Sequence, residues 1–332
     1  MKVLIVSNEC DRKKRLGNPI IPRLIKSLKK NKDIESAAFS PFRNKVSDFL
    51  RIRRVSRKYD IVHIQFGGLY ALLVWFGLLG VKIPKLITFH GTDIHAKEMS
   101  TAKSVLSKIK IWLSQKASFL LILVMDKSGF VSDSLYQYVP KWILHRREKQ
   151  LFVQPLGVDY DAFRLMTKKE ACESLGIKNR KYALFSDKSS TTLKRKDIAD
   201  AIIDELGGVY ELLYMCNVKA EMVPYYVNAC DFLLLTSDEE GSPNIIRETL
   251  VVNKRVFSVD VGDAKEQLQG LANSSIVSRN PHEASLTIRS VLQRPYTDNT
   301  RDRLRAKLDM ANTTDRLVKL YKGLQIINAT TK

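Results

Sequence analysis

Short runs of apolar residues alternate with longer segments of helical periodicity through the first half of the chain. The runs predict buried strands at Lys2–Ser7, Ile61–Gln65, Leu86–Phe89, Leu120–Val124 and Gly129–Val131. The segment Pro19–Lys30 carries apolar residues at the three- and four-residue spacing of a helix. Runs of four to six apolar residues between helices are typical of a parallel sheet that helices cover on both faces.

The second half of the chain repeats this scheme. Its apolar runs, each followed by a helical pattern, predict strands at Tyr182–Ser186, Glu211–Met215, Phe232–Thr236 and Arg255–Val259. A final helix is predicted over Arg301–Leu324. Two runs of strand–helix alternation in 332 residues predict two doubly wound α/β domains, joined near residues 150–165. Ligands bind such sheets at the carboxyl ends of the strands, so residues there are the candidates for function.

Positive charge is concentrated in the first of these halves. The chain has 55 Lys and Arg residues against 35 Asp and Glu residues, a formal net charge of +20. Residues 1–150 hold 29 of the basic and 11 of the acidic side chains, whereas residues 151–332 are nearly balanced. The two domains should therefore have different partners. The first should meet something anionic, such as nucleic acid, an acidic membrane surface or a phosphorylated substrate.

Cysteine usage and the length of the apolar runs bear on the compartment. The four cysteines are Cys10, Cys172, Cys216 and Cys230, and they form no C-x-x-C pair. We therefore expect no thiolate zinc site in the protein, and we expect it to function in a reducing compartment. Met1–Val6 does not match a signal peptide. The two strongest apolar stretches, Leu69–Val81 and Phe119–Met125, are shorter than the roughly 18–20 residues of a membrane-spanning helix. We expect a cytoplasmic protein that is soluble or bound to a membrane surface.

The segment Asp231–Leu250 is the most informative for chemistry. A buried strand runs into a polar turn, and Ser242 followed by Pro243 predicts the N-cap and first residue of a helix. The start of such a helix offers free N–H groups to a phosphate. Glu240 precedes this point and Glu248 follows it in the helix, so two carboxylates are available to accept hydrogen bonds from the hydroxyls of a sugar. The alternative is that both are ordinary solvated acids at a helix start.

Several motifs together resemble one enzyme family. Glu240–Glu248 resembles the Glu-x7-Glu signature of retaining glycosyltransferases with the two-Rossmann-domain (GT-B) fold, and in particular the glycosyltransferase group 1, family 4-like enzymes of bacterial polysaccharide biosynthesis. Four further segments match family elements in the expected order: Thr88–Asp93 (T-F-H-G-T-D), Val131–Asp133, Pro155–Asp159 (P-L-G-V-D) and Leu193–Asp197 (L-K-R-K-D). The resemblance implies two doubly wound Rossmann-like domains that face a central cleft.

The resemblance also implies roles for individual residues. Glu248 would hold the ribose of a nucleotide sugar, Glu240 the hydroxyls of the donated hexose, and His90 would lie beside the reacting centre. Lys194 would neutralise the diphosphate as it leaves, a form of electrostatic stabilisation that often dominates catalysis. The remaining candidates for donor binding are Lys188, Arg195, Gly241, Ser242, Pro243, Asn244 and Gly17. The alternatives are a solvated basic turn for the Lys188–Lys196 loop and a structural role for His90. His63 is expected in the core or in support of the site.

The same resemblance divides the chain and shows where it departs from the family. It implies an acceptor-binding domain over residues 1–155, a donor-binding domain over 156–305, and a C-terminal helix over 306–332 that packs back on the first domain. Ser186-Asp187 stands where the family often has Gly-Arg. One of the two usual phosphate cations is therefore missing or replaced by Lys188.

No cofactor or metal is expected. Asp159-Tyr160-Asp161 has the D-x-D spacing of metal-dependent glycosyltransferases, but its place after Gly157-Val158 favours a turn and the start of a helix. The resemblance implies a UDP-sugar as the donor and retention of configuration. It offers no carboxylate nucleophile, so the acceptor hydroxyl would attack on the face from which the diphosphate leaves.

A basic helix suggests the partner of the first domain. Thr101–Ala117 places Val105, Ile109, Trp112 and Leu113 on one face and most of its lysines elsewhere, which suits a membrane interface. We expect a peripheral enzyme on the inner face of the cytoplasmic membrane, with a lipid-linked or polysaccharide acceptor. The alternative for the helix is that Trp112 packs on the sheet while the lysines face water.

Two other classes of function compete with the enzyme. A non-catalytic sugar-nucleotide-binding relative would explain the Ser186-Asp187 departure. A basic nucleic-acid-binding protein would explain the charge of the first half. It would give no role to Glu240 and Glu248, and the sequence has no recognisable nucleic-acid-binding motif, so nucleic acid is not the expected partner.

Overall fold

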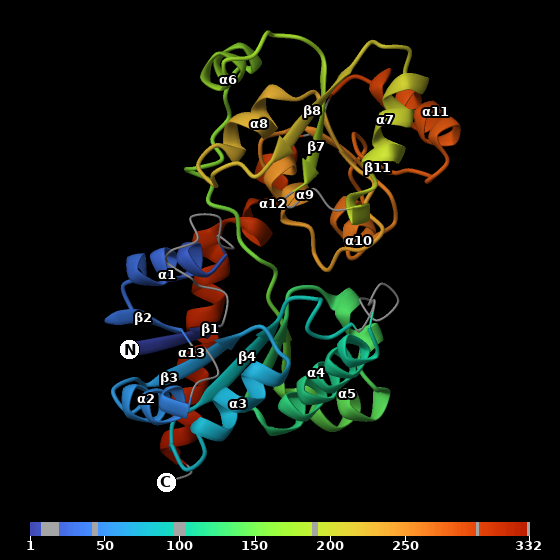
Figure 1. The fold of residues 1–332 in the computed structure, drawn as a ribbon. Coiled ribbons are helices and arrows are strands. Elements are labelled where there is room, and N and C mark those ends of the chain that lie inside the picture. The colour runs from blue at the N-terminus through green and yellow to red at the C-terminus, as the bar shows by residue number, and fades with distance from the viewer. Residues whose placement is uncertain (8–19, 42–45, 96–103, 188–191, 297–298, 331–332) are drawn as a thin grey trace. The chain divides into compact units, whose positions relative to one another are not determined.

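The chain folds into two compact α/β units. The structure, a computed structural model, describes residues 1–7, 20–41, 46–95, 104–187, 192–296 and 299–330. Unit 1 comprises Met1–Gly157 and Met310–Lys332, and unit 2 comprises Val158–Asp309 (Figure 1). Within the described residues, no helix combines the length and apolarity needed to cross a bilayer.

Unit 1 is built on a six-stranded parallel sheet of order β2-β1-β3-β4-β5-β6. Its strands are β1 (Lys2–Ser7), β2 (Ser36–Pro41), β3 (Ile61–Gln65), β4 (Lys85–Phe89), β5 (Lys127–Phe130) and β6 (Leu151–Val153). Its helices are α1 (Ile20–Lys30), α2 (Val46–Ser56), α3 (Leu69–Gly77), α4 (Val105–Val124), η2 (Asp133–Tyr138), α5 (Lys141–Arg147), η3 (Glu148–Gln150) and α13 (Met310–Thr330).

Both faces of this sheet are covered, as the continuous apolar runs predict. On β1, Val3 and Ile5 pack in one core with α1 and α13, whereas Leu4 and Val6 pack in a second core with α2, α3 and α4. The alternation follows from the two-residue period of a strand, which sends neighbouring side chains to opposite faces. The predicted parallel sheet with two covered faces is therefore confirmed.

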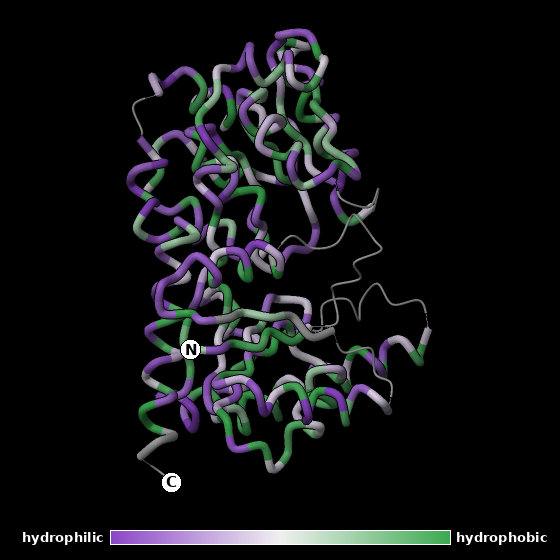
Figure 2. The backbone as a smooth tube through the Cα atoms, turned by 90° about the vertical axis from the view of Figure 1, so that its left-hand side faces the viewer, coloured by the Kyte–Doolittle hydropathy of each residue, from purple (hydrophilic) through white to green (hydrophobic). Residues whose placement is uncertain are grey.

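The C-terminal helix α13 belongs to unit 1. The Oγ atoms of Ser27 on α1 and Thr314 on α13 lie 2.7 Å apart, and Asn31 donates a hydrogen bond of 2.6 Å to Asp315. Hydrophobic and hydrophilic residues alternate along this helix, which ends at the C-terminus in Figure 2. Four of its apolar residues, Leu317, Val318, Tyr321 and Leu324, are buried in the core that the helix shares with the sheet, whereas Ile326 and Ile327 near its end are exposed.

Unit 2 has a five-stranded parallel sheet of order β11-β10-β9-β7-β8. Its strands are β7 (Tyr182–Asp187), β8 (Glu211–Cys216), β9 (Phe232–Leu235), β10 (Arg255–Ser258) and β11 (Ser275–Ile276). Its helices are α6 (Lys168–Leu175), η4 (Thr192–Lys194), α7 (Lys196–Glu205), α8 (Val223–Ala229), α9 (Asn244–Leu250), α10 (Ala264–Leu268), α11 (Pro281–Leu292) and α12 (Thr300–Leu308). The four strands predicted for this half are confirmed within one residue at each end.

Two predicted elements are wrong. Leu120–Val124 is the end of helix α4, not a strand: Leu121 and Ile122 are buried while Leu120 and Val124 remain over a third exposed. The single helix predicted over Arg301–Leu324 is two helices, α12 and α13, that belong to different units. They separate at Asp309, whose extended backbone forms a parallel bridge to Val158.

Candidate functional site

The loops that carry the predicted donor residues start at the two central strands of unit 2. β7 and β9 pair directly, although β8 lies between them in the sequence. After β7 the chain continues to β8 at one edge of the sheet, and after β9 it continues to β10, toward the opposite edge. Such a switch point, at the carboxyl ends of parallel strands, is where doubly wound sheets bind ligands.

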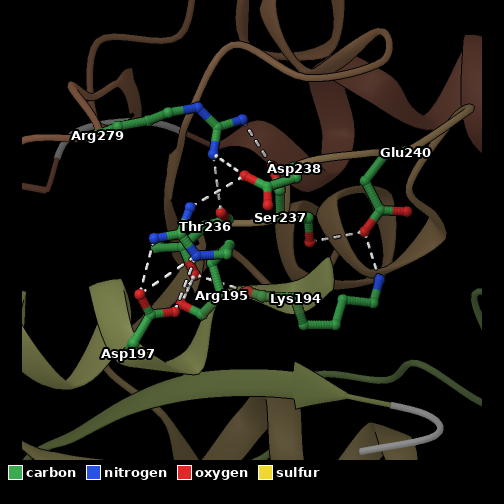
Figure 3. A network of polar contacts seen from close by, with 8 residues as sticks. All are labelled: Lys194, Arg195, Asp197, Thr236, Ser237, Asp238, Glu240 and Arg279. Carbon is green, nitrogen blue, oxygen red and sulfur yellow. Dashed lines mark hydrogen bonds and ion pairs between the residues drawn. The ribbon is translucent and has the colours of Figure 1, made fainter. Parts of the chain in front are cut away.

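Lys194 and Glu240, from the loops that follow β7 and β9, contact each other at this switch point. Lys194 ends the short helix η4, and its Nζ forms an ion pair with Oε1 of Glu240 (Figure 3). The Ser237 hydroxyl donates a hydrogen bond of 2.9 Å to the same carboxylate oxygen. The two charged side chains are 23% and 15% exposed, so each is partly desolvated but reachable from solvent.

Hydrogen bonds to main-chain groups connect the loop after β7 to the loop after β9. The Thr236 hydroxyl lies 3.0 Å from the carbonyl of Lys194 and 2.9 Å from that of Arg195, within donating distance of both. The amide of Asp238 donates a hydrogen bond of 2.8 Å to the carbonyl of Leu193. The position of Lys194 relative to Glu240 is therefore fixed by main-chain contacts as well as by their ion pair.

Arg195 sits at the N-cap of α7 with a left-handed backbone (φ 51°). Its guanidinium donates to Asp197 at 2.7 and 2.9 Å and reaches Asp238 at 3.4 Å (Figure 3). The hydrogen bonds that Arg195 donates to Asp197 raise the pKa of Arg195. The charge of Arg195 is thus already matched by carboxylates on the same edge.

Arg279 also lies at the carboxyl end of β9, and the sequence did not predict it there. It follows β11 and donates to Asp238 at 2.9 Å, to the Ser237 carbonyl at 2.9 Å and to the Thr236 carbonyl at 3.3 Å (Figure 3). It therefore holds the start of the β9 loop. Its separation of 41 residues from Asp238 left no local pattern by which to find it.

The start of α9 differs from the prediction. The helix begins at Asn244, its N-cap is Pro243, and no side chain caps it, so the expected Ser242 cap is wrong. The Ser242 hydroxyl instead donates to Asp263 at 2.5 Å and accepts from Arg247 at 2.9 Å. A buried pair of charges thus recruits the hydroxyl that the motif suggests for capping.

This buried pair anchors the turn before α9. Arg247 and Asp263 are each 3% exposed, and their closest charged atoms are 3.7 Å apart. Arg247 also donates to the Asn244 side chain at 3.0 Å, and burial lowers its pKa. Gly262 (φ +57°) lies so close to the turn that a Cβ on it would stand only 2.5 Å from the Gly241 carbonyl oxygen, so this position requires glycine.

Glu248 lies on α9 and is 8% exposed. Glu240 and Glu248 therefore occupy the two places that the motif predicts, one in the turn and one in the helix. Two other candidates, Lys188 and Gly17, lie outside the described residues.

His90 belongs to unit 1 and follows β4 directly. Its Nε2 lies 2.9 Å from Oε1 of Gln65, at the end of the neighbouring strand β3, and its ring stacks on Phe66 at 4.0 Å. The carboxylate of Asp93 accepts the backbone N–H groups of Gly67, His90 and Gly91 at 2.6–2.9 Å. Burial raises the pKa of Asp93 to about 6.

Metal-binding geometry is not found in the described part of the chain, where no three His, Cys, Asp or Glu side chains cluster. At the D-x-D spacing, Oδ1 of Asp159 accepts the backbone N–H groups of Asp161 and Ala162, both at 3.1 Å. This confirms the turn expected there, but the helix start expected with it is wrong, because the next helix is α6, which begins at Lys168.

Comparison with solved structures identifies the architecture. No protein-family model matches the sequence, and no curated protein matches it. The chain superposes on HepE from Anabaena in complex with UDP (13% identity, TM-score 0.70, 97% of this chain and 100% of that one). It is also similar to sucrose-phosphate synthase from Thermosynechococcus elongatus (13%, 0.75, 97% and 98%) and to the UDP-GlcNAc 2-epimerase of Neisseria meningitidis (13%, 0.60, 96% and 99%). These likenesses over nearly the whole chain, with two parallel α/β sheets, show that the protein has the GT-B fold.

Proposed function

We propose that the protein is a glycosyltransferase that moves a hexose-type sugar from a nucleoside diphosphate, with a UDP-sugar as the first choice, to an acceptor hydroxyl. The observation that carries this proposal is the Lys194–Glu240 pair at the switch point of the unit 2 sheet. A cation and a carboxylate side by side suit a ligand that joins a diphosphate to a polyhydroxylated ring. HepE, which shares the fold, binds UDP and UDP-glucose in its crystal structures.

In this proposal, different residues at the carboxyl ends of β7 and β9 bind different parts of the donor. When the donor binds, Lys194 contacts the diphosphate in place of part of its contact with Glu240. Glu240 then accepts hydrogen bonds from hydroxyls of the sugar. Glu248 holds the ribose. Arg195, Gly241, Ser242, Pro243 and Asn244 are the proposed residues around the diphosphate. The other two candidates for donor binding, Lys188 and Gly17, lie outside the described residues.

The proposed transfer retains configuration and needs no metal. The bond from the anomeric carbon to the phosphate oxygen breaks as the bond to the acceptor oxygen forms on the same face. The proton of the acceptor hydroxyl passes to the departing phosphate oxygen. Lys194 stabilises the charge that grows on the diphosphate, and His90 helps to position the reacting groups.

Nucleotide binding tests the donor site. In a thermal-shift panel of nucleoside diphosphates, UDP should stabilise the wild-type chain, and Glu248→Ala should reduce that stabilisation because the ribose loses its carboxylate partner. A tenfold loss of affinity corresponds to about 1.4 kcal/mol. Glu173→Ala, on the exposed side of α6, is the matched control and should respond as the wild type does. Equal UDP stabilisation of Glu248→Ala and wild type would refute the ribose assignment.

The acceptor side of the proposal rests on α4. Val105 and Leu106 are 72% and 80% exposed, and Trp112 is 48% exposed, so this part of the helix is not packed on the sheet. The helix has no acidic residue and includes Lys108 and Lys110. An exposed apolar face with basic neighbours suits an anionic lipid surface. We therefore propose a lipid-linked or polysaccharide acceptor and a peripheral enzyme on the inner face of the cytoplasmic membrane.

Liposome retention checks the membrane partner. Vesicles with anionic lipid should retain the wild-type chain at moderate salt, and Leu106→Ser with Trp112→Ser should lower retention several-fold. Leu286→Ser on α11, a similarly exposed leucine of unit 2, should have no effect. Binding of the double variant at the wild-type level, or preference for DNA over the vesicles, would contradict the proposed surface.

A further inference from the structure

A line of buried polar side chains crosses unit 1 from the C-terminal helix to His90. The hydroxyl of Tyr321 on α13 lies 2.6 Å from Nδ1 of His63 on β3. Nε2 of His63 lies 2.7 Å from the Thr88 hydroxyl and 3.0 Å from Nε2 of Gln65. The other end of the Gln65 amide, Oε1, meets Nε2 of His90 at 2.9 Å. This line is local to unit 1 and independent of unit 2.

Hydrogen-bond chemistry orders the protons along this line. Burial lowers the pKa of His63 to about 3, so its ring is neutral at physiological pH and carries one proton. The Gln65 amide nitrogen can only donate, which makes Nε2 of His63 an acceptor. The His63 proton then lies on Nδ1 and is donated to the oxygen of Tyr321. Because the Gln65 oxygen can only accept, Nε2 of His90 must carry a proton.

Other contacts hold the rest of the His90 residue. Phe66 stacks on the ring with an interplanar angle of 27°, and its own backbone is left-handed, with φ 68°. A bulky residue with positive φ is uncommon and persists where its surroundings enforce it. Asp93 fixes the backbone N–H of His90. With backbone and ring face fixed, the amide of Gln65 is what selects the protonated ring nitrogen.

We propose that Gln65, His63 and Tyr321 are positioning residues that fix the ring orientation and the tautomer of His90. The consequence for turnover rests on the proposed function, in which His90 acts beside the reacting centre. The tautomer itself does not rest on it. Tyr321 gives the C-terminal helix a chemical task in addition to packing, because its hydroxyl sets the orientation of His63.

Nitrogen NMR of the full chain labelled on its five histidines reads the tautomer without any assay of transfer. His90→Gln identifies the His90 signals. The wild-type ring should show the Nε2–H form, and Gln65→Leu should convert it to a mixture of forms. Gln65→Glu keeps an acceptor toward His90 and should retain the Nε2–H form while it shifts the His63 signals. Gln137→Leu, a glutamine of η2 outside the line, is the matched control.

Kinetics of the same variants separate positioning from packing. Gln65→Leu should lower kcat about 10- to 100-fold with little change in the KM for the donor, since a small misplacement of a catalytic group has effects of this size. Tyr321→Phe keeps the buried ring and removes only the hydroxyl, and it should also lower kcat. It serves as the test variant if Gln65→Leu does not fold. An unchanged His90 signal in both variants overturns the inference. A changed signal with unchanged kcat overturns the positioning role. A changed signal in a chain without transferase activity supports the effect of the three residues on the His90 tautomer and refutes the proposed function.

Discussion

Lys194→Ala is expected to lower kcat by about 100- to 1,000-fold, the loss typical of removing one group that stabilises developing charge. Lys194 is the cation that faces Glu240 at the carboxyl edge of β7 and β9. Loss of its charge leaves the departing diphosphate without a partner that is already desolvated and in place. Steady-state transfer from a UDP-sugar measures the effect.

Two further variants show whether the charge or the ion pair matters. Lys196→Ala removes a neighbouring lysine that pairs with Asp200 on the exposed side of α7 and should leave kcat within about twofold of wild type. Lys194→Ala combined with Glu240→Gln removes both partners. If only the ion pair mattered for structure, the double variant would recover activity, so recovery would contradict the proposed role of Lys194.

Arg247→Met is expected to give the largest loss of stability, about 3–5 kcal/mol, because it leaves a buried carboxylate without its cation. Asp263 and Arg247 are both almost fully buried, and together they tie Ser242 to the start of α9. Urea unfolding followed by circular dichroism measures the change in the free energy of unfolding.

The double variant Arg247→Met with Asp263→Leu should be less destabilised than Arg247→Met alone, since no unpaired buried charge remains. Arg303→Met, at an exposed arginine of α12, should change the free energy of unfolding by less than about 0.5 kcal/mol. A loss for Arg247→Met as small as that for Arg303→Met would show that the buried pair does not anchor the turn.

The interior strands other than β5, which reads K-S-G-F, were predictable because they are buried on both faces and therefore appear as continuous apolar runs. The three strands that were not predicted, β2, β6 and β11, are all edge strands of their sheets. β2 reads S-A-A-F-S-P, and β11 has only two residues. The run Leu120–Val124 misled because a helix segment with few polar residues cannot be told from a strand by periodicity.

The candidate site was predictable where a local motif carries it. The local pattern singled out Glu240 and Glu248 within one strand–loop–helix unit, and the family resemblance singled out Lys194 in another. The roles of all three residues stay predictions. Arg279 and Gln65 did not follow, because their partners are set by the order of strands in each sheet and not by neighbours in sequence. Ser242 shows the converse: its local pattern favours a helix cap, and a tertiary contact with Asp263 decides otherwise.

Hydrogen–deuterium exchange of the full chain with and without UDP tests the location of the donor site most directly. We expect UDP to slow exchange in residues 192–196 and 236–244, at the carboxyl ends of β7 and β9. The segments at the opposite ends of these strands, around Tyr182 and Asp231, should be unchanged. Protection confined to those opposite ends, or no protection at saturating UDP, would contradict the proposed donor site.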